Sequence, residues 1–219
     1  MSTSSVQLRG FVVIDHMQPQ FAATVAASSD GYFPVAGESA CWVEVCPGIA
    51  VNRLLDAALK ATSVVPGAMI MERSYGTLEV HGSDQGQVRE AGARILKAAD
   101  QTQDDGFKPA ILTSEVIRQI DSHHAMLINK SRTGMLVLGG DTLYTLEVNP
   151  AVWVLAAANE AEKAAPVRII GLDNNGAVGR LRLAGTDAAI EEAVKAVHLA
   201  LSKGTGRDNP AGKGGTPCS

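Results

Sequence analysis

Aromatic and charged residues are scarce in this chain of 219 residues. Aromatics make up 4% of it and charged residues 19%, whereas glycine occurs 22 times. Small aliphatic side chains must therefore fill the interior, and a hydrophobic content of 46% is enough to form a folded core. The net charge of −4 argues against a general nucleic-acid binder, because such proteins need a basic face.

Long hydrophobic runs and the pattern of a signal peptide are also missing. The chain contains no 18 consecutive apolar residues, which a membrane-spanning helix requires. Its opening, MSTSSVQLRG, has neither a basic end nor an apolar middle. We therefore expect a cytoplasmic protein that has no membrane partner.

Cysteine is rare, with three copies in the whole chain. Cys41 and Cys46 are five residues apart in a strand-like run, so their side chains point to opposite faces and do not pair readily. Cys218 lies in a segment rich in glycine and proline. None of the three has the spacing of metal ligands, so we interpret them as two buried thiols and one exposed thiol.

Local signatures of enzymes are missing as well. There is no Gly-x-Ser-x-Gly, no Walker loop and no His-Glu-x-x-His. His123 and His124 form the one adjacent histidine pair, which we interpret as a surface pair at a helix start. A metal site that includes Asp121 is the alternative. We expect neither enzyme activity nor a bound cofactor or metal.

What the sequence does contain is an internal repeat at an offset of 103 residues. The stretch VEVCPGIAVNRLLDAALKATSVV, from Val43, then lies on LEVNPAVWVLAAANEAEKAAPVR, from Leu146. The segments before these blocks correspond more loosely and require a three-residue insertion. We predict two domains, residues 1–107 and 108–204, and a mobile tail, residues 205–219. The identities that define the frame are Glu44 with Glu147, Pro47 with Pro150, Lys60 with Lys163, Gly76 with Gly179, Gly82 with Gly185 and Asp84 with Asp187.

Each repeat shows the same order of expected elements. A strand and a short helical stretch come first, followed by a glycine-bounded strand near residues 32–35 or 135–138 and a further strand that ends near the matched glutamate. A helix with apolar residues at helical spacing follows, then a hairpin, then a second helix that a polar residue can cap. Mixed strands with two main helices per repeat predict an α+β fold with the helices on one face.

The repeated block resembles the opening strand and helix of bacterial microcompartment (BMC) shell domains. In that family a strand ending in glutamate precedes a glycine and a helix with an Asp-Ala-x-x-Lys-Ala pattern, and Glu44, Gly48, Asp56 and Lys60 hold those places. The second copy departs from it, because alanine replaces the glycine and asparagine the aspartate. In each copy a further strand precedes the strand that opens the family's domain, and this arrangement resembles a circular permutation of that domain. The resemblance therefore implies two tandem, circularly permuted BMC-type (ferredoxin-like) domains.

The resemblance also implies an assembly and its working parts. Permuted tandem members resemble the trimeric shell proteins of ethanolamine and propanediol compartments, so we expect a homotrimer that forms a pseudohexameric tile beside other shell proteins. Lys60 and Lys163 stand where the family places its tile-edge lysine; the plain alternative is a solvated helix lysine. The two hairpin tips are expected to line a central pore for small polar metabolites, although either can be an ordinary tight turn. These tips are Arg73, Ser74 and Tyr75 in the first repeat, and Asp173, Asn174, Asn175 and Gly176 in the second.

The residues of the two hairpin tips also indicate whether the pore could hold a cofactor and whether it could be gated. Some tandem relatives carry an iron–sulfur cluster on a pore-loop cysteine, but neither tip here contains cysteine. Tyr75 is large enough to act as a movable plug. Two other functions remain open from the sequence: a trimeric α+β sensor with a small molecule between subunits, and an enzyme whose site is spread over strand ends. Formation of flat arrays separates the shell protein from both.

Overall fold

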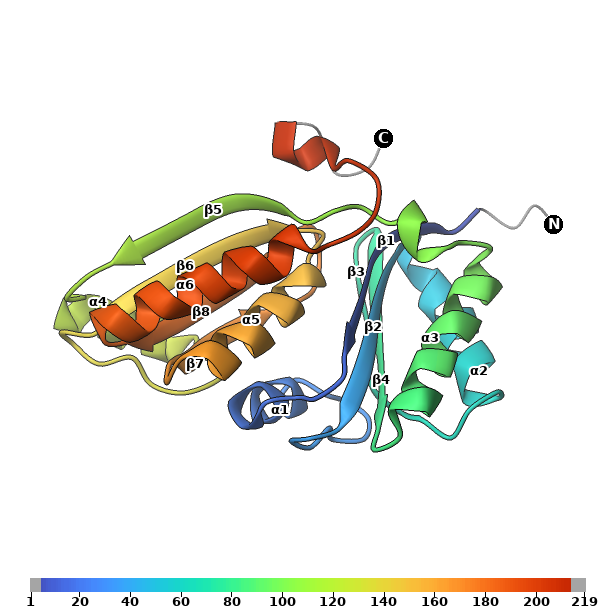
Figure 1. The fold of residues 1–219 in the computed structure, drawn as a ribbon, viewed down its shortest axis with the longest axis horizontal. Helices are drawn as coiled ribbons and strands as arrows, with labels where there is room; N and C mark the ends of the chain where they lie inside the picture. Colours follow the sequence, from blue (N-terminus) through green and yellow to red (C-terminus); the bar gives the residue numbers. More distant parts are fainter. Residues whose placement is uncertain (1–4, 214–219) are drawn as a thin grey trace.

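The computed structural model describes residues 5–213, which form two antiparallel sheets of the same design (Figure 1). In each sheet the strand that begins the repeat lies at one edge and the first strand of the hairpin lies at the other. The first sheet has the order β1-β2-β4-β3, built from β1 (Gln7–Ile14), β2 (Ser39–Cys46), β3 (Val65–Glu72) and β4 (Tyr75–Gly82). The second has the order β5-β6-β8-β7, built from β5 (Ala110–Ile117), β6 (Thr142–Asn149), β7 (Arg168–Asp173) and β8 (Gly179–Gly185).

Two main helices cover one face of each sheet, which confirms the α+β prediction (Figure 1). They are α2 (Val51–Leu59) and α3 (Gln85–Ala99) in the first repeat, and α5 (Trp153–Ala164) and α6 (Asp187–Ser202) in the second. A shorter helix follows the first strand of each repeat, α1 (Pro19–Ala26) or α4 (Ser122–Lys130). Residues 5–213 also contain three short 3-10 helices: η1 (Gly48–Ala50), η2 (Gln103–Asp105) and η3 (Pro210–Lys213).

The periodicity and capping signals explain where these helices form. The apolar residues of α2 at helical spacing, Val51, Leu54 and Ala58, are all buried against the first sheet. Asp84 accepts hydrogen bonds from two backbone N–H groups at the start of α3, and Thr186 accepts one at the start of α6. Both caps agree with the sequence-based expectation.

The repeat needs no insertion, which corrects our alignment of its first part. At an offset of 103 residues, Met17 corresponds to Ile120, and each carbonyl oxygen accepts a 2.9 Å hydrogen bond from a glycine, Gly37 or Gly140. These glycines have φ angles of 89° and 88°, in the left-handed region. The alike pairs Ile14-Asp15 and Ile120-Asp121 suggested the insertion, whereas the turn geometry keeps one frame for the whole repeat.

The strands expected at residues 32–35 and 135–138 do not form, and this prediction is wrong. Both segments run as loops beside the edge strands β3 and β7 and donate only a few backbone hydrogen bonds to them. Gly31 and Gly134 permit the close approach, since a Cβ at either position would lie within 2.4 Å of a carbonyl oxygen of β3 or β7.

The first part of the expected tail is docked, which corrects the prediction that it is mobile. Arg207 exchanges two backbone hydrogen bonds, of 2.7 and 2.9 Å, with the segment that joins the repeats. The Asn209 amide donates to the backbone oxygen of Asn149 at 2.8 Å. Backbone and amide groups make this contact, so apolar periodicity did not reveal it. Residues 214–219, including Cys218, lie outside the described residues.

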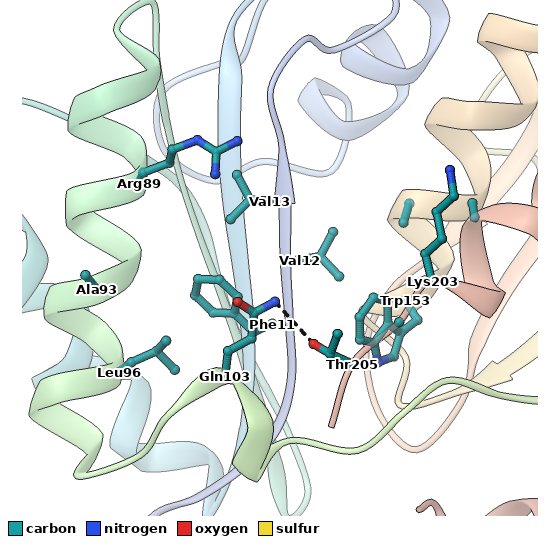
Figure 2. A pocket seen from close by; sticks show the side chains of 13 residues that line it. Phe11, Val12, Val13, Arg89, Ala93, Leu96, Gln103, Trp153, Lys203 and Thr205 are labelled. Atoms are coloured by element: carbon teal, nitrogen blue, oxygen red, sulfur yellow. Dashed lines mark hydrogen bonds between the residues drawn. The ribbon is translucent and has the colours of Figure 1, made fainter. Parts of the chain in front are cut away.

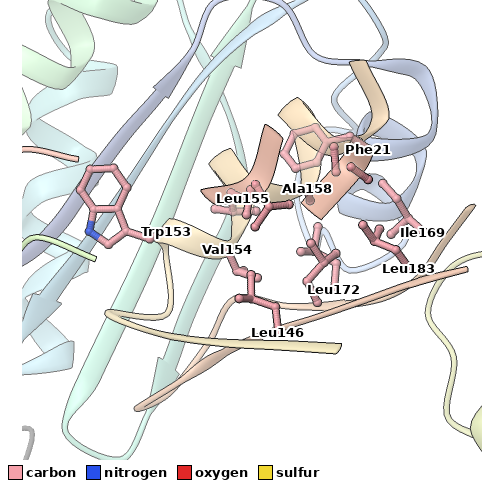
Figure 3. Packing of buried hydrophobic residues seen from close by; sticks show 14 of the residues in the cluster. Phe21, Leu146, Trp153, Val154, Leu155, Ala158, Ile169, Leu172 and Leu183 are labelled. Atoms are coloured by element: carbon pink, nitrogen blue, oxygen red, sulfur yellow. The ribbon is translucent and has the colours of Figure 1, made fainter. Parts of the chain in front are cut away.

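One of the hydrophobic clusters in residues 5–213 spans both repeats, while two others lie within a single repeat. Helix α1 leaves the first sheet and packs on α5 and β7 of the second (Figure 1). Phe21 of α1 lies edge-on to Trp42, with ring centroids 5.8 Å apart, and both belong to the cluster that includes Ile169 and Leu183 (Figure 3). None of the helices in residues 5–213 combines the length and the apolar composition that a membrane-spanning segment requires.

Candidate pore and interface surfaces

The two hairpin tips occupy equivalent positions in the repeat. Arg73 and Ser74 form the exposed two-residue turn between β3 and β4, and Arg73 has a φ of 54°. Gly176 stands at the same position of the second repeat, with a φ of 77°. An arginine held in the left-handed region is backbone strain that glycine avoids, so the first tip keeps a charged side chain at an energetic cost.

The structure brings the two tips of one chain together. Gly176 lies against the Glu72 carboxylate, because a Cβ on this glycine would be 2.8 Å from Oε2 of Glu72. Asp173 ends β7 and lies 3.8 Å from Arg182, while Asn174 and Asn175 are half-buried beside it. Glu72 is the last residue of β3 and takes part in this contact, although the sequence did not single it out as a tip residue.

Each tip is anchored by the segment that precedes the repeat's main helix. The backbone N–H of Gly48 donates to the Ser74 carbonyl oxygen at 2.8 Å. In the second repeat the Asn149 side chain donates to the Ala177 carbonyl oxygen at 2.6 Å. Gly48, which follows Pro47, and Asn149, which precedes Pro150, thus position the tips, which links the matched prolines of the repeat to the candidate pore.

Tyr75 belongs to the sheet rather than to the turn. It is the first residue of β4 and is buried, with the Arg9 guanidinium carbon 4.0 Å from the centre of its ring. A cation stacked on a buried aromatic ring holds the ring in place. This environment contradicts the expectation that Tyr75 is a movable plug.

Lys60 and Lys163 are both exposed near the ends of equivalent helices. Lys60 lies 2.6 Å from Asp56, and Lys163 lies 3.6 Å from Glu160. Pairs of this kind between exposed side chains contribute little to stability, so both ammonium groups are available to a partner. Their assignment to the tile edge stays a prediction.

A buried ion pair joins the two repeats. Arg9 Nε lies 2.6 Å from Glu44 Oε1, and both side chains are almost fully removed from solvent. The other carboxylate oxygen of Glu44 accepts a 2.9 Å hydrogen bond from the backbone N–H of Val152, at the start of α5. Burial raises the pKa of Glu44, while Arg9 and the Val152 amide oppose that shift. The sequence marked Glu44 as a repeat match but gave no sign of its partner.

A second buried polar pair lies on β4. The Nδ1 atom of His81 is 2.9 Å from Glu79 Oε1, and both residues are buried. Burial raises the pKa of Glu79. Burial also opposes the charged form of His81, but the hydrogen bond and the charge of Glu79 outweigh it, so the pKa of His81 is raised. The alternating strand pattern places both side chains on one face but did not indicate that this face is covered.

Other candidates from the sequence lie apart from these surfaces. His123 and His124 are in the exposed first turn of α4, where Asp121 caps the helix, and no group of three or more metal-binding side chains occurs in residues 5–213.

A shallow groove separates α3 of the first repeat from α5 and α6 of the second, with Phe11 and Trp153 among its lining residues (Figure 2). Trp153 donates its indole N–H to the Phe107 carbonyl oxygen, so it packs between the repeats.

A duplicated four-stranded α+β module, permuted so that an extra strand begins each copy, defines the class of tandem microcompartment shell domains. Residues 8–105 match the family model of the CsoS1D N-terminal domain. The carboxysome shell protein CcmP of Synechococcus elongatus is 45% identical over 205 residues, which cover 94% of this chain and 96% of the relative. The carboxysome shell protein CsoS1D of Hydrogenovibrio crunogenus is 42% identical over 92% of this chain and 99% of its own length.

Solved structures agree with these relatives. The fused permuted hexameric shell protein MSM0275 from the RMM microcompartment superposes with a TM-score of 0.87 at 39% identity, covering 90% of this chain and 96% of its own. The double ringed trimeric shell protein MSM0271 from the same microcompartment has a TM-score of 0.89 at 35% identity, covering 93% and 99%. The chain belongs to the family of tandem-domain bacterial microcompartment shell proteins. It is a structural component of a microcompartment shell.

Proposed function

We propose that three copies of the chain close into a ring of six modules, a pseudohexameric tile that packs beside other shell proteins. The supporting observation is the pair of equivalent modules in each chain, which supplies two alternating wedges of a six-part ring. Solved relatives described as trimeric and as permuted hexameric have the same fold over more than nine-tenths of their chains.

The hairpin tips then surround a central opening that admits small polar metabolites. Contact between Gly176 and Glu72 joins the two tips of one chain, so three copies present three such paired tips to one axis. Arg73 and Ser74 from the first tip and Asp173 from the second place charged and hydroxyl groups there, which can replace water around a polar solute. The opening filters by size and polarity and catalyses no reaction.

Lys60 and Lys163 lie at the outer edge of the tile and contact neighbouring tiles. Lys60→Ala should therefore reduce flat arrays in negative-stain micrographs while the ring remains folded. Lys97→Ala, which changes another exposed helix lysine, is the matched control. Arrays that are equally abundant in all three proteins would show that Lys60 is a solvated surface residue.

Electron cryomicroscopy of the purified protein tests the opening itself. The proposal requires both tips of all three chains around one axis, with Arg73 and Asp173 facing the opening. A ring that places the tips at its outer rim would refute the pore while leaving the shell fold intact. A small molecule bound between subunits of a protein that never forms arrays would favour the sensor instead.

A further inference from the structure

The same carbonyl oxygen is anchored in both hairpin tips, but the two donors differ in kind. Ser74 and Ala177 correspond at the offset of 103 residues. The donor to Ser74 is the backbone N–H of Gly48, at 2.8 Å, whereas the donor to Ala177 is the side-chain amide of Asn149, at 2.6 Å. A backbone donor is fixed by its own segment, but a side-chain amide can turn about its bonds. The second tip therefore depends on whatever orients Asn149.

The contact between the repeats explains why the donors differ. Ala151 stands at the position of Gly48, and its backbone N–H donates to the Glu44 carboxylate across that contact. The group that anchors the first tip is thus already engaged in the second repeat, and the Asn149 side chain takes its place.

The C-terminal segment, residues 205–213, orients the Asn149 amide. The chain turns back after α6, and η3 lies beside β5, whose first residue pairs with Asn149 (Figure 1). The Nδ2 atom of Asn209 lies 2.8 Å from the backbone oxygen of Asn149 and 3.0 Å from its Oδ1. The Oδ1 atom of Asn209 in turn accepts the backbone N–H of Ala211 at 3.0 Å. Asn209 therefore presents its NH2 group to Asn149, whose own NH2 group is left to face the tip.

These contacts form a directional chain of hydrogen bonds from the C-terminal segment to the second tip. Asn209 donates to the oxygen of the Asn149 amide, and the nitrogen of that amide donates to the Ala177 carbonyl oxygen. Asn149 is buried, with 2% of its surface exposed, so water does not readily replace either bond. Loss of the Asn209 donor leaves a buried amide oxygen without that bond, and it removes the group that keeps the amide nitrogen on the tip.

The two asparagines occur together only in the second repeat. At the offset of 103 residues, Cys46 stands at the position of Asn149 and Gly106 at that of Asn209. The segment that contains Gly106 follows α3, and its η2 contacts β1 as η3 contacts β5. The first repeat thus docks the equivalent segment without an amide pair, so docking alone does not require the pair.

We propose that Asn209 is a positioning residue for the second hairpin tip, and that the docked C-terminal segment thereby sets the shape of the central opening. The inference rests on the proposed pore, because the second tips supply half of its lining. Release of the segment frees the Ala177 carbonyl group, and the turn at residues 174–178 becomes mobile in all three chains. The first tips, which Gly48 anchors, keep their place.

Hydrogen exchange followed by mass spectrometry tests the relay in the assembled protein. Asn209→Ala changes a half-buried side chain and removes the donor to the Asn149 amide. Because one hydrogen bond makes a modest net contribution, exchange in peptides of residues 172–181 should accelerate by about fivefold or more. Exchange in peptides of residues 70–78, which contain the first tip, should stay close to that of the wild type. Unchanged exchange at the second tip, or equal acceleration at both tips, would overturn the inference.

Two control variants separate the relay from a general loss of stability. Thr186→Ala removes the cap of α6 at the far end of β8 and should lower stability by a similar amount. Asp208→Ala removes an exposed 3.2 Å ion pair of the C-terminal segment with Lys108, which should leave that segment docked. Both should leave exchange at the second tip near that of the wild type, because it exchanges through local opening. Acceleration by either control equal to that of Asn209→Ala would contradict the relay.

Asn149→Leu separates docking of the segment from positioning of the tip. Leucine cannot donate to the Ala177 carbonyl group, whereas Asn209 still donates to the backbone oxygens of residue 149 and Lys108. Residues 205–213 should therefore stay protected from exchange while the second tip exchanges as fast as in Asn209→Ala. A second tip that remains protected would show that this hydrogen bond does not hold it, and the inference would fail.

Electron cryomicroscopy of Asn209→Ala connects the relay to the opening. Density for the second tips should weaken around the axis while density for the first tips persists. Central tips that are equally well ordered in the variant and the wild type would overturn this inference and leave the proposed opening standing. Tips at the outer rim of the ring would refute the pore itself, and with it any role of Asn209 in the opening.

Discussion

Removing the Glu44 carboxylate should strongly destabilise the contact between the repeats. Glu44→Ala leaves the Arg9 guanidinium in a site that is 1% exposed and takes away the acceptor of the Val152 N–H group. Removing one partner of a buried ion pair costs about 3–5 kcal/mol, and an amide without its acceptor adds about 1 kcal/mol. We expect the free energy of unfolding to fall by about 4–6 kcal/mol, a large part of the roughly 5–15 kcal/mol that stabilises a typical protein.

Urea denaturation followed by circular dichroism, at one fixed protein concentration, measures this loss. Glu90→Ala is the matched control, because Glu90 forms a 2.6 Å pair with Arg94 in which both side chains are almost half-exposed. Such a pair contributes at most about 1 kcal/mol. The double variant Arg9→Met/Glu44→Met should lose less than Glu44→Ala, since no charge remains buried alone. Equal small losses for Glu44→Ala and Glu90→Ala would refute the reasoning.

Three further changes test the buried pair, the docked tail and the strained turn. The raised pKa of His81, beside Glu79 and near Glu38, means that its charged form stabilises the fold fully below pH 6.5, its ordinary pKa, and that this stabilisation is lost as the pH rises through the raised value. Melting temperatures should therefore fall above pH 6.5, and His81→Gln should flatten that fall; identical pH profiles would contradict the assignment. Asn209→Ala should reduce the free energy of unfolding by about 1–2 kcal/mol through its lost hydrogen bonds, and an unchanged denaturation midpoint would show that the tail does not dock in solution. Arg73→Gly should leave stability equal or raise it by up to about 1 kcal/mol because the φ of 54° suits glycine, whereas a clear loss in a thermal melt would indicate that the arginine side chain stabilises the turn.

Hydrophobic periodicity and helix-capping residues were enough to predict most of the secondary structure from the sequence. Apolar spacing placed α2, and the side chains of Asp84 and Thr186 placed the starts of α3 and α6, because these signals act within a few residues. The repeat frame then transferred each assignment to the other half of the chain. The glycine-bounded segments at residues 32–35 and 135–138 have a composition typical of strands, yet they form loops. A strand needs a continuous hydrogen-bonded ladder with a neighbouring strand, and the sequence does not show whether that ladder forms.

The contacts between the repeats could not be predicted from the sequence, because they also depend on residues that are far apart in the chain. Glu44 and Glu147 match in the alignment, yet the first is buried against the second repeat and the second is half-buried. Nothing local distinguishes them, since the difference arises only from which module lies next in the chain. The docked tail was missed in the same way, because Asn209 contacts Asn149 through polar groups far away in sequence.

Light scattering of the purified protein tests the central claim most directly. If the chain forms a six-module tile, its mass in solution at micromolar concentration will be three times that of the 22.8 kDa chain, or six times if two rings stack. A stable monomer or dimer would contradict the tile, because two modules, or four, cannot close a six-part ring.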